Sequence, residues 1–137
     1  HVWDNSGAVL WKGNKDLDGS NNAVEIGERP EPTSTPVPTE INCRVIVADI
    51  DGDGTREVIA AKNIPNIAVI QRMRIYKTSR LIAYKVDGST LEQAWTTREI
   101  QYAIADLQLQ GGTIYIAAHK GQYSNISAGK SRIMWFE

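Results

Sequence analysis

The stretch between Val45 and Ala61 constrains the fold of this chain more than any other part of the sequence. Two apolar runs, Val45 to Ala48 and Val58 to Ala61, flank an acidic segment in which aspartates alternate with glycines. Glycine lets a backbone turn sharply because it has no Cβ atom to clash. Two short apolar runs joined in this way predict a pair of neighbouring β-strands with a tight loop between them.

The acidic loop also predicts a cation site. Asp49, Asp51 and Asp53 alternate, so a tight loop can bring their carboxylates to one point, where they repel one another unless a hard cation neutralises them. Ligand sets made only of oxygen favour calcium over the softer transition metals. The expected ligands are the side chains of Asp49, Asp51, Asp53 and Glu57, together with the carbonyl oxygen of Thr55. The alternative is an Asp-Gly turn that binds nothing, because Asp and Gly are the commonest turn formers.

The spacing of the acids does not fit the EF-hand, the calcium loop that lies between two helices. That loop needs a glutamate at about position 12. Counted from Asp49, this position is Ala60, and the acid falls earlier, at Glu57. The residues that follow Glu57 form a strand-like apolar run, so we expect the ion to lie in a loop between two strands.

Composition excludes several classes of function. The chain has 137 residues, about one domain, with 15 basic and 16 acidic residues and a formal charge of -1. No overall field favours nucleic acid, and no apolar run approaches the roughly 18 residues of a membrane span. We therefore expect no nucleic-acid partner and no membrane span. The single cysteine, Cys43, excludes an intrachain disulfide framework and is expected to be a small apolar residue, with an intermolecular bridge as the alternative.

A polar segment separates the first residues from the acidic loop. Residues 1–12 contain two short apolar pieces around a turn, which predicts a hairpin. Residues 13–40 are polar and then proline-rich, which predicts a loop or linker, since proline cannot donate to a sheet. Asp16 and Asp18 form a possible weak second cation site in it, although a solvated loop is the alternative interpretation. Further along, a turn is expected at Asn63 to Asn66.

The strand and loop pattern repeats along the chain. At an offset of 57 residues, the acidic segment Ala48 to Thr55 matches Ala105 to Gly112. Each unit is predicted to contain four short antiparallel strands, with the acidic loop after the first, which is the pattern of a propeller blade. In the second copy only Asp106 survives. Gln108, Gln110 and Ile114 replace the other acids, so we expect the second loop to be empty or weak.

The acidic loop and its flanking strands resemble the FG-GAP, or VCBS-type, repeat of integrin-like β-propellers. The resemblance covers residues 45–137 and the fragment 1–11. It implies an all-β fold of antiparallel four-stranded blades, with calcium bound between the first two strands of a blade. The predicted organisation is a hairpin that ends a preceding blade (1–12), a loop or linker (13–40), a blade with the calcium-binding loop (41–98) and a second blade with a degenerate loop (99–137).

This chain is too short for a closed propeller, which needs four or more blades. It holds about two blades and the N-terminal hairpin, so the fold is incomplete as a single chain. Three explanations compete: a cleaved piece docked to the rest of the protein, identical copies that complete one another, or an unusual two-bladed domain. The expected partners are therefore other protein chains. The hairpin is also expected to complete the last, three-stranded sheet, in this chain or in a neighbour.

No pattern predicts catalysis, so we expect no enzyme activity. His1 and His119 lack partners at metal-ligand spacing, and no serine nucleophile motif is present. The four tryptophans are expected to pack in the core, with a stacking platform for sugars as the alternative. The expected function is a calcium-stabilised structural or binding module that is extracellular, on the cell surface or periplasmic. The alternatives are a carbohydrate-binding module and an accessory chain of an exported enzyme or redox complex.

Overall fold

The computed structural model describes residues 2–3, 5–13, 17, 19–25, 38–65, 76–87, 90–120 and 129–136. All regular structure in these residues is β-strand, which confirms the predicted all-β class. The strands are β1 (Val2–Trp3), β2 (Val9–Trp11), β3 (Ala23–Glu25), β4 (Pro38–Glu40), β5 (Ile46–Ala48), β6 (Glu57–Pro65), β7 (Tyr76–Asp87), β8 (Thr90–Thr96), β9 (Ala103–Gln110), β10 (Thr113–Lys120) and β11 (Lys130–Phe136).

The first large sheet has four antiparallel strands in the order β5-β6-β7-β8. This is the order predicted for one repeat unit, with the acidic loop joining β5 to β6. The predicted turn at Asn63 is wrong, because β6 continues to Pro65. The Asn63 side chain stays in the sheet to bond the backbone of β9, and Pro65 sits at the end of the strand, where a missing N–H costs little.

The second large sheet has three antiparallel strands in the order β11-β10-β9. Gly111 and Gly112 join β9 to β10, with φ angles of 58° and 83°. Two successive positive φ angles are typical of the tight hairpin turn that matches the twist of β-strands. The expected second loop therefore does not form. Asp106 to Gln110 belong to β9 instead, and this sheet contains the three strands that the sequence predicts for it.

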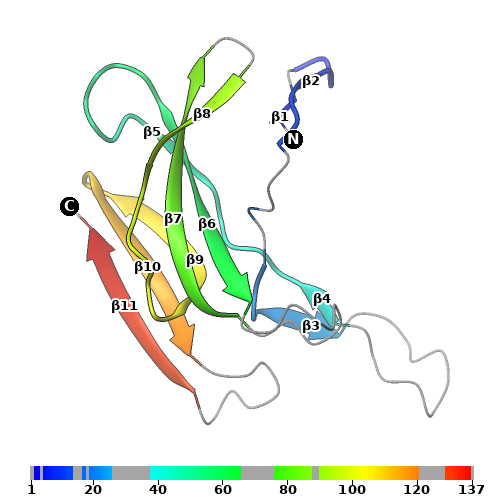
Figure 1. Cartoon of the computed structure of the whole chain (residues 1–137), viewed down its shortest axis with the longest axis vertical. Helices are drawn as coiled ribbons and strands as arrows, with labels where there is room; N and C mark the ends of the chain where they lie inside the picture. The colour runs from blue at the N-terminus through cyan, green and yellow to red at the C-terminus, as the bar shows by residue number, and fades with distance from the viewer. Residues whose placement is uncertain are drawn as a thin grey trace, which may run out of the picture.

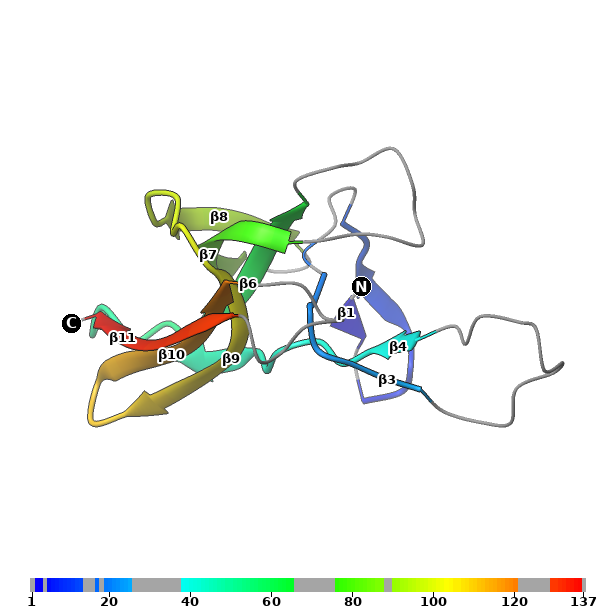
Figure 2. The same cartoon turned by 90° about the horizontal axis from the view of Figure 1, so that it is seen from below.

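The two large sheets pack against each other, with β9 lying along β5, β6 and β7 (Figures 1 and 2). The core between them is aliphatic: Ile59 and Leu81 from the first sheet meet Leu107 and Ile116 from the second, and all are at most 1% exposed. Each such side chain contributes about 1.5–3 kcal/mol when it is fully buried. Cys43 is partly buried against this core, which agrees with its predicted apolar role and raises the pKa of its thiol.

The tryptophans do not form this core as a group. Trp95 packs against it, but Trp3 and Trp135 are 56% and 63% exposed, so the prediction of core packing is wrong for these two residues. The Trp11 side chain lies outside the described part of the structure. Aliphatic side chains from both sheets fill the space between them, and Trp3 and Trp135 lie outside it.

The N-terminal hairpin forms as predicted, but it does not complete the three-stranded sheet of this chain. In the described residues β1 pairs with β2 alone, and β2 lies beside β8. Figure 1 shows the hairpin on the opposite side of the molecule from β11, so it cannot reach the free edge of that strand. Completion by the hairpin of a neighbouring chain stays a prediction.

The segment predicted as a loop or linker contains structure of its own. Strands β3 and β4 form a two-stranded sheet within residues 13–40. Asn21 holds this region against the first sheet, because its side chain donates to the Tyr76 carbonyl at 2.8 Å and accepts from the Tyr76 amide at 3.0 Å. Gly19, with a φ of 118°, lies so close to the Tyr76 ring that a Cβ atom would clash at 2.5 Å.

Candidate metal centre

Carboxylates accept backbone amides throughout the loop at residues 49–56, and Asp49 accepts two of them. Asp49 accepts the amide hydrogen of Gly52 at 2.8 Å and that of Gly54 at 2.9 Å. Both glycines have positive φ angles, 74° and 88°, which a residue with a Cβ atom adopts only at a cost. The alternation of Asp and Gly therefore has a local cause. The glycines supply the bends, and the first aspartate satisfies the backbone N–H groups that the bends expose.

Glu57 is the buried member of the cluster. It begins β6, and only 1% of the residue is exposed. Its Oε2 atom accepts a hydrogen bond from the Ile50 amide at 2.9 Å. Its Oε1 atom has no hydrogen-bond partner among the described residues. A buried carboxylate oxygen without a partner is costly, so this atom needs a positive charge close by.

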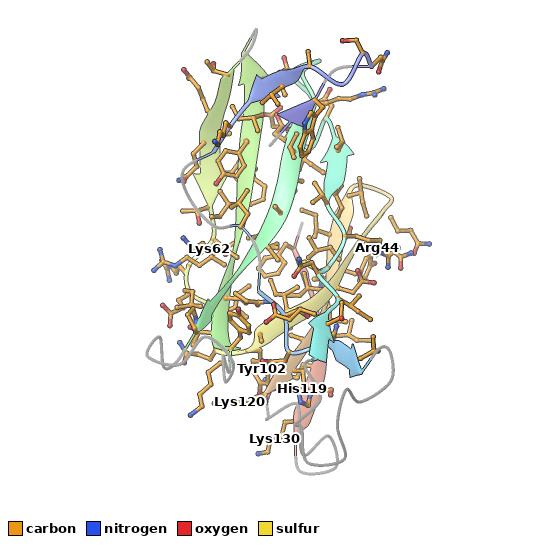
Figure 3. The ribbon with its side chains drawn as sticks, turned by 90° about the vertical axis from the view of Figure 1, so that its right-hand side faces the viewer. Arg44, Lys62, Tyr102, His119, Lys120 and Lys130 are labelled. Carbon is orange, nitrogen blue, oxygen red and sulfur yellow. The ribbon has the colours of Figure 1, made fainter. Side chains whose placement is uncertain are left out.

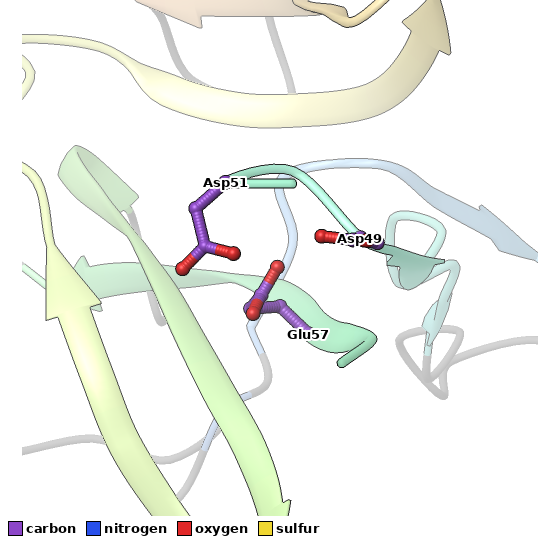
Figure 4. A group of neighbouring side chains, drawn as sticks. All are labelled: Asp49, Asp51 and Glu57. Atoms are coloured by element: carbon purple, nitrogen blue, oxygen red, sulfur yellow. The ribbon is translucent and has the colours of Figure 1, made fainter. Parts of the chain in front are cut away.

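Three of the predicted ligands come together. One oxygen from each of Asp49, Asp51 and Glu57 lies within 4.8 Å of the others, and Figure 4 shows the three carboxylates facing a common point. Asp53 stays outside this group. Its Oδ1 atom accepts from the Thr55 amide at 2.8 Å, which places Thr55 in the same loop. The cluster can therefore hold a metal ion through at least three oxygens, two from the loop and one from the first residue of β6.

Lys85 is the member of the site that the sequence did not reveal. It lies on β7, directly across from Glu57. Its ammonium group donates to Asp51 Oδ2 at 2.9 Å and to Asp53 Oδ2, and lies 3.4 Å from Glu57 Oε1 without the geometry of a hydrogen bond. The bonds to Asp53 and then Asp51 raise the pKa of Lys85 well above its usual range. The same contact with Lys85 is the main cause that lowers the pKa of Asp53.

The carboxylates of the site outnumber its positive charges. Four carboxylates and the single ammonium of Lys85 leave a formal charge of −3. Each carboxylate oxygen has two lone pairs, so the oxygens that Asp49 uses to accept amide hydrogens can still ligate an ion. All the donors are oxygen, and hard divalent cations prefer such donors. The residues therefore fit calcium or magnesium better than a softer metal.

The equivalent acid of the second repeat has a different partner. Asp106 accepts a hydrogen bond from Arg44 Nε at 2.9 Å and a second from the guanidinium NH2 group. The bonds from Arg44 are the main cause that lowers the pKa of Asp106. Gln108 and Gln110, which replace the other acids, belong to strand β9. This carboxylate is therefore neutralised by a side chain of its own chain.

Most of the other residues singled out by the sequence cannot be compared with the cluster. Asp16 and Asp18 lie outside the described residues, and so does His1. His119, on β10, is partly exposed, with its Nδ1 atom 3.2 Å from Ser131 Oγ. In the described ranges no helix is long and apolar enough to cross a membrane.

Comparison with known proteins adds no relative to this picture. No protein-family model matches the chain, and neither does any curated protein or solved structure. The arrangement of the carboxylates is therefore the main basis for a functional argument.

Proposed function

We propose that this chain is a calcium-stabilised β-sheet module that serves a structural or binding role, without enzyme activity, outside the cytoplasm. The observation that carries the proposal is the Oε1 atom of Glu57, which is buried and lacks a hydrogen-bond partner in the described structure. Glu57 also belongs to a group of converging carboxylates that retains negative charge even with the Lys85 ammonium 3.4 Å from this Oε1 atom. A divalent cation would compensate both the buried oxygen and the surplus charge.

Calcium is the better candidate of the two hard cations. It accepts 6–8 oxygen ligands in flexible geometry, whereas magnesium demands a near-ideal octahedron. The loop offers carboxylates at uneven depth, since Glu57 is buried while Asp49 and Asp51 are exposed. Sites of this open kind bind calcium at about 10⁻⁴–10⁻³ M, which extracellular fluid supplies and cytosol does not. This is our reason to propose an extracellular, cell-surface or periplasmic location.

The proposed partners are other protein chains. The two large sheets share the strand order of one repeat unit, but the second has three strands where the first has four. We propose that both are units of a propeller-type repeat that is completed in a larger assembly. Light scattering tests this part: a multimer in calcium that dissociates in chelator agrees with it, and a monomer under both conditions contradicts it.

Thermal unfolding tests the cation site. We expect calcium, titrated to about 10 mM, to raise the Tm of the wild-type chain, because an ion that binds only the folded state stabilises it by about 2.7 kcal/mol at one hundred times its Kd. Magnesium should raise it less. Glu57→Gln should abolish the response, whereas Glu92→Gln, the same change at an exposed strand position, should retain it.

Calorimetric titration completes the test, since it detects binding without reference to stability. A wild-type chain that binds no calcium and has the same Tm in calcium and in chelator would disprove the proposed site. A Glu57→Gln variant that binds calcium as tightly as the wild-type chain would show that the ion lies elsewhere.

A further inference from the structure

The two faces of the three-stranded sheet differ in composition. The inner face carries Leu107, Ile116 and other aliphatic side chains that form the core. On the outer face, β9 presents Asp106, Gln108 and Gln110, because side chains alternate along a strand. The neighbouring strands present Tyr115, Ala117, Ile133 and Trp135 on that same face. The outer face thus has a polar strip along β9 beside an apolar, aromatic strip along β10 and β11.

Two aromatic residues lie side by side in the apolar strip. Tyr115 on β10 pairs with Trp135 on β11, so both side chains leave the sheet on the same side. Directly opposed residues of this kind have Cβ atoms about 4.5–5.5 Å apart. Tyr115 is 38% exposed and Trp135 is 63% exposed. Large aromatic surfaces that remain in contact with water often mark a binding site.

A hollow of about 130 Å³ adjoins Tyr115 of this pair. Tyr115 and Ile133 line it together with Gln108, Asp106 and Arg44. Gln108 lies directly across from Tyr115, and Asp106 directly across from Ala117. Arg44 reaches the hollow from the segment before β5, and its side chain lies at the surface (Figure 3). The hollow therefore joins an aromatic surface to a guanidinium, a carboxylate and an amide.

The polar and aromatic side chains of this outer face make it a poor packing surface for another apolar sheet. The core cluster between the two sheets is apolar, and the polar side chains buried beside it, such as that of Asn63, are hydrogen-bonded to backbone groups. Covering the outer face with a similar layer would remove Gln108 and the Arg44–Asp106 ion pair from water, at a cost that packing must offset. The face instead suits a ligand that has a flat C–H surface on one side and hydroxyl groups at its rim.

We propose that the outer face of β9–β11 binds an oligosaccharide built of pyranose units. One sugar ring lies with its C–H face on Trp135 and Tyr115, and the next group enters the hollow. There the planar guanidinium of Arg44 donates to hydroxyl oxygens, the Asp106 carboxylate accepts from hydroxyls, and the Gln108 amide does both. Few polar groups beside an aromatic surface are typical of small-molecule sites. The site lies apart from the cation cluster and does not depend on it.

Affinity electrophoresis in native gels tests the proposal with the chain as it exists. Separate gels contain laminarin, hydroxyethyl cellulose, galactomannan or polygalacturonate, and we expect at least one of them to retard the wild-type chain. Trp135→Ala should weaken binding about tenfold or more through the lost stacking surface. Gln108→Ala should weaken it with the aromatic pair intact. Trp3→Ala is the matched control, since this tryptophan is 56% exposed on a different sheet and should leave retardation unchanged.

Three results would overturn the proposal. One is a wild-type chain that none of the four polysaccharides retards. Another is equal retardation of the wild-type chain and Trp135→Ala, with an unchanged Tm to show that both are folded. The third is a wild-type chain that self-associates in light scattering but binds no polysaccharide, and whose self-association is lost in Trp135→Ala, since the face would then be a protein interface. Gels that contain chelator separate this site from the cation site, because sugar binding should persist there.

Discussion

The two large sheets connect their first two strands in opposite ways. Between β5 and β6 the chain forms a wide loop at residues 49–56, held by carboxylates that accept backbone N–H groups. Between β9 and β10 it forms a turn of two glycines, Gly111 and Gly112. The sequences align residue for residue, so the difference comes from side-chain chemistry. The second repeat has Gln108 and Gln110 in place of acids and Leu109 in place of Gly52, whose positive φ angle bends the first loop, and its strand continues through these residues.

This difference changes which residues face each other. In the first sheet Ile46 pairs with Ile59, and the repeat alignment would make Ala103 the partner of Ile116. The actual partner of Ile116 is Leu107, four residues further along β9. A shift by an even number keeps the same side of the strand toward the core. A sequence repeat can therefore keep the same alternation of side chains toward the core while the register between the two strands shifts.

The position of β9 depends most on Asn63, so its replacement should have the largest effect. The buried Asn63 amide donates to the Ile104 carbonyl at 2.9 Å and to the Gly19 carbonyl at 2.6 Å, and it accepts from the Ile104 amide at 2.8 Å. Asn63→Ala leaves these buried groups without partners and should lower the free energy of unfolding by about 3 kcal/mol. Urea denaturation measures this. Asn42→Ala, at an exposed position, is the control, and an equal loss in both variants would contradict the prediction.

Lys85 is the positive charge beside the carboxylates of the loop between β5 and β6. Its removal should make this loop differ more from the turn between β9 and β10. Lys85→Met takes the ammonium away from Asp51, Asp53 and Glu57. We expect calcium to bind about tenfold more tightly, since it no longer competes with a fixed charge, while the chain without calcium becomes less stable. Calorimetric titration gives the affinity and thermal unfolding gives the stability. Weaker calcium binding in the variant would show that Lys85 supports the ion rather than competing with it.

The turn at Gly111 and Gly112 should tolerate substitution less well than the empty space around it suggests. A Cβ atom at Gly112 would meet nothing within 4 Å, but the φ angle of 83° is unfavourable for alanine. Gly112→Ala should therefore lower the free energy of unfolding by about 1 kcal/mol, without any change in calcium binding. Denaturation with and without calcium checks both statements, and a calcium effect would show that the two connections are coupled.

Acid should weaken both connections slightly. The pKa values of Asp53 and Asp106 are lowered by Lys85 and Arg44, so each pair stabilises the fold above the ordinary carboxyl pKa and loses this contribution as pH falls through the lowered value. Both pairs are exposed, so we expect a loss of only a few tenths of a kcal/mol for Asp106 between about pH 5 and 3. Asp106→Asn should flatten this part of the stability profile, and an unchanged profile would contradict the assignment.

Restoring the acids to the second repeat should have the smallest effect. Gln108→Asp with Gln110→Asp recreates the acidic pattern of the first loop in sequence, but both positions lie within β9. Side chains two apart on a strand stand parallel and do not converge on one point. Calorimetry should detect no second calcium site. A gain of binding would show that the loop geometry follows from the acids alone.

The sequence predicts the fold class and most of the cation cluster, because both depend on local patterns. Alternating apolar residues indicate the strands, and Asp49, Asp51 and Glu57 lie within nine consecutive residues. Lys85 could not be predicted, because it meets Glu57 only through the register of β6 and β7. The exposure of Trp135 could not be predicted either. Periodicity shows which residues of a strand share a face, but not which of the two faces another layer covers.

Lys85 also bears on the order of events during folding. A loop that brings like charges together would ordinarily need its ion before it could form, because the carboxylates repel one another once the last strand docks. Here β7 carries its own positive charge into the cluster when it pairs with β6. We expect the chain to fold in a compartment poor in divalent ions and to take up calcium later by exchange. On this expectation, folding and metal loading are separate steps.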